Sequence, residues 1–328
     1  MPPSLQALPG LADLRGRIDA KLIDAVSTPD PRLTEMTSHL VKAGGKRLRP
    51  ILVALSSVTK EADGAAVLGA VGDDAITGGV AVELAHVGSL HHDDVIDEAT
   101  TRHNVDSVNA RWGNLRAILS GDYLLARGSE LAASLGTEIA TILAQAIGRL
   151  CEGEVRELYT AFQVGRSEDE YFAAIEGKTA ALFTSACRIG GLVAELPADA
   201  VDALEAFGHG YGMAFQIVDD ILDVVSTDEA LGKPAGHDMV EGVYNLPVLA
   251  ALAGPEGDEL RALLGGPLTD EARRKATDLV RASDGVAQAI KSATAHVDRA
   301  LAHLDSVPTG PARDTLAAMA RELVTSVS

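Results

Sequence analysis

The pattern of apolar and polar positions predicts a chain built almost entirely from helices. Between residues 11 and 26 the apolar side chains recur every three or four positions, which is typical of an amphipathic helix. Similar apolar stretches predict further helices over residues 33–42, 51–58, 80–96, 115–135, 139–160, 182–193, 201–225, 270–282, 286–304 and 312–324. No stretch of five or more residues alternates convincingly between apolar and polar, as a half-buried strand would. We therefore expect an all-α protein.

Helix-breaking and helix-capping residues divide this pattern. Gly136 separates two long helices, and Ser167, with Glu170 three positions later, has the spacing of a capping box at the start of another. Residues 60–79 are rich in Gly, Ala and Asp and are interpreted as a loop with a short helix. Residues 231–238 are expected to form a flexible loop of the lid type. We find no linker that would split residues 1–328, so we predict a single domain.

Two runs of aspartates share one spacing. In each, the first and third aspartate are four residues apart, which places them one turn apart on the same face of a helix. The runs are Asp93, Asp94 and Asp97, and Asp219, Asp220 and Asp223. Such like charges among apolar residues repel each other, and Mg²⁺, which binds carboxylates, waters and substrate phosphate, would offset the repulsion. Two complete copies favour a metal and diphosphate site over helix caps. The pair Asp73-Asp74 lacks the third aspartate and is interpreted as part of a loop.

Basic residues are scarce but locally concentrated. Residues 44–50 read Gly-Gly-Lys-Arg-Leu-Arg-Pro, so three cations follow two glycines. This stretch predicts a phosphate-type anion site, with a solvated turn as the alternative. His86 lies about two turns before Asp93 and shares its face, although a lone histidine in a helix is more often a core residue. Lys178 lies among apolar residues, where a lysine needs a partner such as an anionic ligand.

Composition narrows the possible partners. The chain has 328 residues, of which 47% are hydrophobic and 3% aromatic, so its interior is aliphatic and suits close helix packing. The formal net charge of −19 argues against nucleic acid and anionic membrane surfaces, which require a basic footprint. Cys151 and Cys187 have neither zinc spacing nor a disulfide framework. No apolar run reaches the roughly 18 residues of a membrane span. We expect a soluble, cytoplasmic protein with no targeting segment.

The ordered set of motifs resembles the trans-isoprenyl diphosphate synthases over nearly the whole chain. The matching motifs are Gly-Gly-Lys-Arg-Leu-Arg-Pro at 44–50, His-Asp-Asp-Val-Ile-Asp-Glu at 92–98 with Arg102 behind it, Gly-Lys-Thr at 177–179, Phe-Gln-Ile-Val-Asp-Asp-Ile-Leu-Asp at 215–223 and Gly-Lys-Pro at 232–234. The resemblance implies a single helical bundle around a deep cavity, with the two aspartate clusters facing each other across its mouth. It also implies Mg²⁺, about three ions per site bound with the diphosphate. The implied substrates are isopentenyl diphosphate and an allylic diphosphate, and the implied assembly is a homodimer.

The resemblance assigns a role to each matching residue. The implied Mg²⁺ ligands are Asp93, Asp97, Asp219 and Asp223, with Asp94 and Asp220 in support. The implied ligands of isopentenyl diphosphate are Lys46, Arg49 and His86, with His103 beside them. The implied contacts of the allylic diphosphate are Arg102, Lys178, Thr179, Gln216 and Lys233. The implied catalytic set is Asp93, Asp97, Lys178, Asp219 and Asp220.

The chain departs from the family pattern at three positions. His103 stands where a second arginine is usual, so we expect a weaker or pH-dependent site for isopentenyl diphosphate, because the unperturbed pKa of histidine is about 6.5. Val243 replaces a frequent lysine, which removes one cation from the lid region, and Asn245 stands where threonine is common. None of these changes affects a metal ligand, so we expect an active enzyme.

Small residues before the first cluster predict a long product. Ser89 and Gly88 lie four and five positions before Asp93, and Ala85 lies one turn further back. Short-chain synthases of the family tend to block this place with an aromatic ring. We therefore expect all-trans chains of about seven isoprene units or more, of the quinone side-chain type, because small side chains leave room in a cavity.

Four alternatives stand beside this interpretation, and the sequence argues against the last two. The first is a geranylgeranyl diphosphate synthase, and the second is a non-catalytic partner subunit of a heteromeric synthase, although both aspartate clusters are intact. The third, a terpene cyclase, should lack the basic stretch at 44–50. A ferritin-like di-metal bundle would need Glu-x-x-His pairs, which we do not find.

Overall fold

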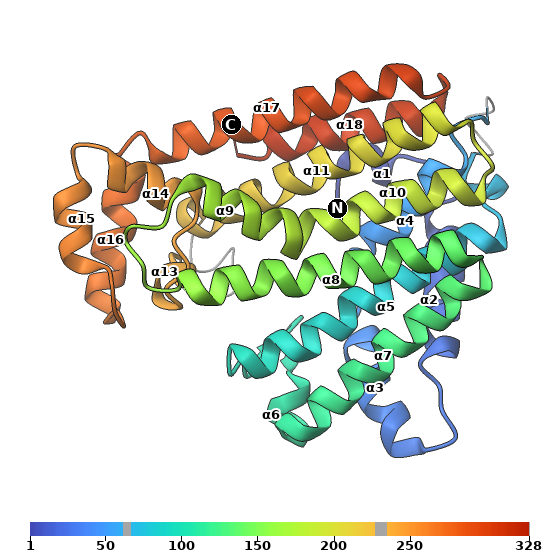
Figure 1. Cartoon of the computed structure of the whole chain (residues 1–328), viewed down its shortest axis with the longest axis horizontal. Coiled ribbons are helices and arrows are strands. Elements are labelled where there is room, and N and C mark those ends of the chain that lie inside the picture. The colour runs from blue at the N-terminus through green and yellow to red at the C-terminus, as the bar shows by residue number, and fades with distance from the viewer. Residues whose placement is uncertain (62–66, 227–234, 328) are drawn as a thin grey trace. The chain divides into compact units, whose positions relative to one another are not determined.

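The structure is a computed structural model that describes residues 1–61, 67–226 and 235–327. Helices account for 77% of the residues that the structure describes, and they dominate the fold (Figure 1). The strands in the described part are β1 (Thr101–Arg102) and β2 (Val105–Asp106), which pair as an antiparallel hairpin. The predicted all-α fold class is therefore confirmed. Across the described ranges, none of the helices combines the length and the apolar character needed to cross a membrane.

The chain falls into two compact units, each built from three segments. The first unit comprises Met1–Ile147, Leu182–Gly208 and His303–Met319. The second comprises Gly148–Ala181, His209–Ala302 and Ala320–Ser328. The prediction of a single domain remains a prediction.

The helices can be assigned to the two units. Those of the first unit are α1 (Pro3–Gln6), α2 (Leu11–Ala25), α3 (Pro31–Ala43), α4 (Leu48–Ser57), η1 (Val67–Ala70), α5 (Asp73–Ile96), α6 (Val108–Trp112), α7 (Asn114–Ser134) and η3 (Leu304–Ser306). Those of the second unit are α9 (Glu168–Ile175), η2 (Glu176–Ala180), α13 (His237–Val240), α14 (Leu246–Ala253), α15 (Gly257–Leu263) and α16 (Asp270–Ala282). Residues of both units occur in α8 (Thr137–Thr160), α10 (Ala181–Val193), α11 (Ala198–Val225), α17 (Gly285–His303) and α18 (Pro311–Thr325).

Helix α5 is longer than the sequence pattern predicts. It begins at Asp73, so the interpretation of Asp73-Asp74 as part of a loop was wrong. Two acidic residues in the first turn complement the positive end of the helix dipole. The apolar pattern is weak here because close contact needs glycine: a Cβ at Gly79 would lie 2.9 Å from the Cα of Pro50, and one at Gly78 would lie 2.7 Å from the side chain of Ile189.

Helices α5 and α7 lie side by side in the first unit and approach closely (Figure 1). A Cβ at Gly128 of α7 would lie 2.8 Å from the carbonyl oxygen of Ala81, and one at Gly88 of α5 would lie 3.1 Å from that of Gly121. A side chain at Gly128 would therefore force a shift of the backbone, and one at Gly88 would be tightly packed, because native interiors are close-packed. The packing fixes the last two turns of α5, which carry the first aspartate cluster.

The second unit is built on an apolar core under α9 and the end of α11. Tyr171, Tyr244 and Met239 are fully buried in this core. Ser167 and Glu170 form the predicted capping box at the start of α9. The helix does not continue regularly through Gly177-Lys178-Thr179, because residues Glu176–Ala180 form the π-helical turn η2. Such turns within helices are frequent at functional sites.

Candidate active site

The three aspartates of the first cluster occupy different environments at the end of α5. Asp93 is half-buried and Asp97 is exposed at the helix C-cap, whereas Asp94 is fully buried. Asp94 Oδ1 accepts a hydrogen bond from Nε of Arg102 at 2.8 Å and forms an ion pair with its Nη2 at 2.7 Å. Burial raises the pKa of Asp94, and the charge of Arg102 opposes this shift. Asp94 therefore holds Arg102 in place. Asp93 and Asp97, which are more accessible and one turn apart, are the carboxylate pair suited to a metal ion.

A tight hairpin presents Arg102 to the first cluster. His103 and Asn104 connect β1 to β2 with φ values of 51° and 63°. Positive φ at both central residues is the signature of a type I′ turn, and histidine and asparagine tolerate this region better than most residues. Asn109 Nδ2 donates to the carbonyl oxygens of Asp94 and Ala99 at 2.8 and 3.0 Å. The hairpin is thereby fastened to the end of α5.

The central cation of the Gly-Gly-Lys-Arg-Leu-Arg-Pro stretch has a structural role. Arg47 is buried and forms ion pairs with Glu83 at 3.1 Å and Asp19 at 3.0 Å, and its Nη2 donates to the carbonyl oxygen of Val41 at 2.7 Å. Lys46 on one side of it is exposed. On the other side, the guanidinium carbon of Arg49 lies 4.6 Å from the centroid of the Phe183 ring. Arg47 anchors the turn, so two of the three cations remain as candidates for binding an anion.

The two predicted histidines lie among these cations. Burial lowers the pKa of His86 well below its usual value, and the charges of Arg49, His103 and Arg102 add to the shift. Reduced hydration lowers the pKa of His103, as do the charges of Arg102 and Arg47, against the opposing effect of nearby carboxylates. Both imidazoles are therefore predominantly neutral at pH 7. In the first unit, Arg49, Arg102 and His103 thus lie close enough to His86 for their charges to act on it.

The second cluster, on α11, is largely turned into the protein. Asp219 is exposed, whereas Asp220 and Asp223 are 5% and 4% exposed. The Oδ2 atom of Asp223 accepts the backbone N–H of Asp238 at 3.3 Å. Burial, together with the charges of Asp238 and Asp219, raises the pKa of Asp220 well above its usual value. Asp219 is therefore the carboxylate of this cluster that is best placed to meet a ligand from solvent.

A chain of hydrogen bonds links Asp220 to two of the predicted substrate-binding residues. Gln216 Nε2 donates to Asp220 Oδ1 at 2.9 Å, and Thr179 Oγ1 donates to Gln216 Oε1 at 2.6 Å. On the other side, the hydroxyl of Tyr171 donates to Asp220 Oδ2 at 2.5 Å. The three predicted residues Thr179, Gln216 and Asp220 therefore form one connected group in the second unit.

Lys178 lies on the π-helical turn between two carboxylates of α8. Its ammonium group pairs with Glu154 at 2.9 Å and also with Glu157, and its side chain is 29% exposed. The prediction that this lysine needs a partner is confirmed, and the partners are two carboxylates of the protein, where the sequence analysis named an anionic ligand as one example. The two carboxylates offset part of the cost of removing the ammonium group from water.

Close backbone contact between α8 and η2 sets the position of Lys178. We expect Gly153→Ala to lower the free energy of unfolding by about 1–3 kcal/mol, the usual cost of overpacking. The reason is that a Cβ at Gly153 would lie 2.4 Å from the backbone N of Lys178 and 2.6 Å from the carbonyl oxygen of Ala174. The measurement is chemical denaturation. Gly148→Ala in the same helix is the control, because nothing lies within 4 Å of its added methyl group and alanine favours helices. Equal stability of the two variants would contradict the prediction.

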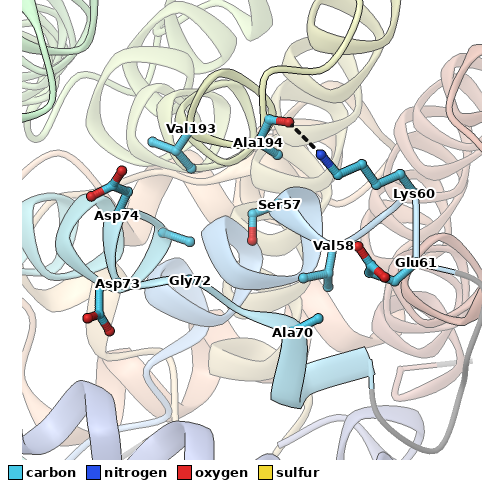
Figure 2. A pocket seen from close by; sticks show the side chains of 11 residues that line it. Ser57, Val58, Lys60, Glu61, Ala70, Gly72, Asp73, Asp74, Val193 and Ala194 are labelled. Atoms are coloured by element: carbon cyan, nitrogen blue, oxygen red, sulfur yellow. Dashed lines mark hydrogen bonds between the residues drawn. The ribbon is translucent and has the colours of Figure 1, made fainter.

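One cavity of about 360 Å³ lies apart from the predicted residues, at the start of α5. Figure 2 shows Asp73 and Asp74 at one side of it and Lys60, which donates to the carbonyl oxygen of Ala194 at 3.0 Å, at the other. None of the motif residues lines it. The cavity is therefore not part of the candidate site.

The carboxylates fit a hard divalent cation. Asp93 and Asp97 offer oxygen ligands from one helix face, and Mg²⁺ typically takes one or two carboxylates and completes its shell with water and phosphate. Within the ranges that the structure describes, no group of three or more His, Cys, Asp or Glu side chains is arranged to hold a metal ion. Water and the phosphate oxygens of a bound substrate are the further ligands that Mg²⁺ typically takes.

Some site residues lie outside the prediction or outside the described ranges. Lys233 falls in residues 227–234, which the structure does not describe. Sequence reasoning missed Tyr171 and Glu157, which contact Asp220 and Lys178 from distant segments, and it treated Asp238 only as part of a loop. Asp238 accepts a hydrogen bond from the buried Asn245 at 3.3 Å. The available signal for Asp238 was an acidic residue in a stretch bounded by Gly236 and Gly242, which follows the second aspartate cluster in the sequence.

Comparisons with known proteins identify the family of this chain. Residues 30–283 match the sequence model of the family described as polyprenyl synthetase. A nonaprenyl diphosphate synthase of Mycobacterium tuberculosis is 39% identical over 94% of this chain and 90% of its own length. A decaprenyl diphosphate synthase structure from Rhodobacter capsulatus has a TM-score of 0.87 at 33% identity, covering 97% of this chain and 98% of its own. A geranylgeranyl pyrophosphate synthase structure from Corynebacterium glutamicum, complexed with calcium and isoprenyl diphosphate, has a TM-score of 0.83 at 36% identity, covering 97% and 96% of the two chains. The chain therefore belongs to the polyprenyl synthetase family.

Proposed function

We propose that the protein is a prenyltransferase that condenses isopentenyl diphosphate with an allylic diphosphate to make a long-chain all-trans polyprenyl diphosphate. The observation that carries this proposal is in the first unit. There, a carboxylate pair suited to Mg²⁺ lies at the end of the helix that carries His86. Burial lowers the pKa of His86, and the charges of Arg49 and Arg102 add to the shift. A metal-binding pair beside a concentration of cations suits substrates that carry diphosphate groups. The long-chain relatives support the proposed product class.

The proposed reaction begins with cleavage of the allylic C–O bond, whose electron pair leaves with the diphosphate. Bound Mg²⁺ would neutralise charge on that leaving group. Asp93, Asp97 and Asp219 are the proposed Mg²⁺ ligands, with Asp223 in a supporting position. Arg102, held by Asp94, and Lys178, held by Glu154 and Glu157, would add fixed positive charge where negative charge develops.

The second half of the reaction forms the new carbon–carbon bond. Lys46, Arg49 and His86 would hold isopentenyl diphosphate so that its double bond attacks the allylic cation. Loss of a proton then gives a chain one isoprene unit longer. This step requires that water be excluded, because water would otherwise capture the cation. His103, being neutral at pH 7, supplies less charge to this site than the usual arginine.

The proposed chain length can be tested at Ser89. This residue is 8% exposed, and its hydroxyl donates to the carbonyl oxygen of His86 at 2.9 Å. Gly88 is less suitable for the test, because its missing side chain faces α7. We expect Ser89→Phe to shorten the product by at least one isoprene unit, because an aromatic ring would fill space next to the first cluster.

The measurement for chain length is mass spectrometry of the products made from isopentenyl and farnesyl diphosphate with Mg²⁺. The wild-type protein should make a ladder ending at about seven units or more, as a deep cavity permits. Ser129→Phe, at an exposed position of α7, should leave the ladder unchanged. An unchanged ladder from Ser89→Phe would place the end of the cavity elsewhere.

A geranylgeranyl diphosphate synthase is the second candidate function. The similarity to the Corynebacterium glutamicum structure favours it, since that similarity covers nearly all of both chains. The same incubation separates the two candidates: elongation that stops at the geranylgeranyl product would support the shorter-chain enzyme, and a longer ladder would exclude it.

We also propose that the protein is a cytoplasmic homodimer. Leu115, Ile118 and Leu119 of α7 are 72%, 41% and 55% exposed, which is unusual for large apolar side chains close together on one helix. A second copy of the chain would cover them. Cys151 and Cys187 are both thiols, as expected in a reducing compartment.

A further inference from the structure

We infer that Tyr171 is a positioning residue that orients the second aspartate cluster through Asp220. The inference rests on the proposed function, because it concerns the same site. It assigns to the adjacent aspartates Asp219 and Asp220 two different tasks: Asp219 meets the metal ion, and Asp220 holds the end of α11 in the orientation that this requires.

Asp220 is fully engaged by protein donors. It is buried, and its two oxygens accept from different elements: Oδ2 from the hydroxyl of Tyr171 on α9, and Oδ1 from Gln216 one turn earlier on α11. A buried carboxylate that lost one of these donors would bear the desolvation cost of an unsatisfied polar atom. The Asp220 side chain is therefore locked in one orientation.

Tyr171 is itself held rigidly, as a positioning residue must be. The capping box of Ser167 and Glu170 fixes the first turn of α9, and the Tyr171 side chain is 1% exposed. The guanidinium carbon of Arg166 lies 5.6 Å from the centroid of its ring, and Arg166 Nη1 donates to the carbonyl oxygen of Tyr244 at 3.2 Å. Phe172 contacts the ring edge-on, with the two centroids 5.3 Å apart.

Arg166 adds a buried positive charge to the group formed by Tyr171 and Asp220. It is only 6% exposed, and the negative charges of Glu157 and Asp220 act on it. A buried cation beside a buried carboxylate offsets part of the cost of removing each from water.

The orientation of Asp220 matters because of its neighbours on α11. Successive helix residues are separated by about 100° around the axis, so fixing Asp220 also fixes the direction in which Asp219 projects. The same carboxylate holds Gln216, which accepts from Thr179 on η2. Removing the tyrosine hydroxyl should therefore disturb the metal ligand and the substrate-binding group together.

The test compares Tyr171→Phe with Tyr244→Phe. Both tyrosines are fully buried in the same apolar core, but the hydroxyl of Tyr244 accepts the backbone N–H of Gly265 at 2.7 Å and does not contact Asp220. Both variants keep the aromatic ring, so both should fold, and thermal unfolding checks that they lose similar stability. They differ in whether the lost hydroxyl contacts the second cluster.

The main readout is the Mg²⁺ concentration needed to bind farnesyl thiodiphosphate, an unreactive allylic analogue, measured by isothermal titration calorimetry. We expect Tyr171→Phe to raise this concentration about tenfold, which is the usual effect of losing a partner that orients a metal ligand. Tyr244→Phe should change it less than about twofold. In steady-state assays, Tyr171→Phe should raise the Mg²⁺ requirement and the KM for the allylic substrate more than it raises the KM for isopentenyl diphosphate.

The outcomes separate this inference from the proposed function. If the wild-type protein elongates its substrates and the two variants have the same Mg²⁺ requirement, the inference is wrong and the function stands. If the wild-type protein binds no allylic analogue and makes no product, the proposed function fails. A selective effect of Tyr171→Phe on Mg²⁺-dependent binding supports the inference whatever the length of the product.

Discussion

Asp93→Asn should lower kcat/KM for the condensation about a thousandfold, which corresponds to about 4 kcal/mol of lost transition-state stabilisation. Asp93 is half-buried and lies one turn before Asp97. Without the Asp93 carboxylate, Asp97 would be the only carboxylate of the proposed pair left to bind the metal ion. The amide keeps the shape of the carboxylate but removes its charge. Because the metal-bound diphosphate is the leaving group, the loss should fall mainly on kcat.

The same helix supplies a control for this substitution. Asp74 is exposed in the first turn of α5, far along the helix from the cluster. Asp74→Asn makes the same chemical change and should leave kcat/KM within about twofold of wild type, because exposed charges far from the chemistry contribute little. Steady-state kinetics at saturating Mg²⁺ measures both variants. Comparable losses in the two would mean that the first cluster does not bind the reacting diphosphate.

Lys178→Gln should lower kcat/KM about a hundredfold to a thousandfold, because it removes a fixed positive charge from the developing negative charge of the leaving group. It should also destabilise the protein by about 1–3 kcal/mol, because Glu154 and Glu157 lose the ion-pair partner that they share. The two effects can be separated with the double variant Lys178→Gln/Glu157→Gln, in which one carboxylate is neutralised. Stability should recover in the double variant and activity should not.

Lys275→Gln is the matched control for the lysine. Lys275 is exposed and pairs with Glu259 at 2.8 Å on the surface of the same unit. An exposed ion pair of this kind contributes little to stability, and this one is not part of the proposed site. Kinetics and thermal unfolding of Lys275→Gln should match those of wild type. If both activity and stability recovered in the double variant Lys178→Gln/Glu157→Gln, Lys178 would have a structural role only.

The helical framework could be predicted from the sequence because its signals are local. The apolar period of α16 gives its observed bounds, Asp270–Ala282, and the capping box at Ser167 lies where the sequence places it. The repeated aspartate spacing identifies both clusters, because two residues four apart on a helix are neighbours whatever packs around them. Gly136 ends α7 with a φ of 117°, as a glycine between two long helices should.

The partners of these residues could not be predicted, because they come from distant parts of the chain. Arg47 resembles Lys46 and Arg49 in sequence, yet Glu83 and Asp19 draw it into the interior. The early start of α5 was missed because glycines at its beginning, which weaken a helical pattern, meet the backbone of Pro50 and the side chain of Ile189. Such contacts depend on which surfaces the folded chain brings together.

The sequence by itself determined the all-α class, the helices that carry the two aspartate clusters and the type of chemistry, since these follow from residue type and helical period. Only the tertiary structure decided which aspartate of each cluster points outward. Asp94 is buried against Arg102, and Asp220 is buried against Tyr171, and in both cases a donor from another segment selects the residue. The physical reason is that a buried carboxylate requires hydrogen-bond donors, and the fold alone determines where those donors lie.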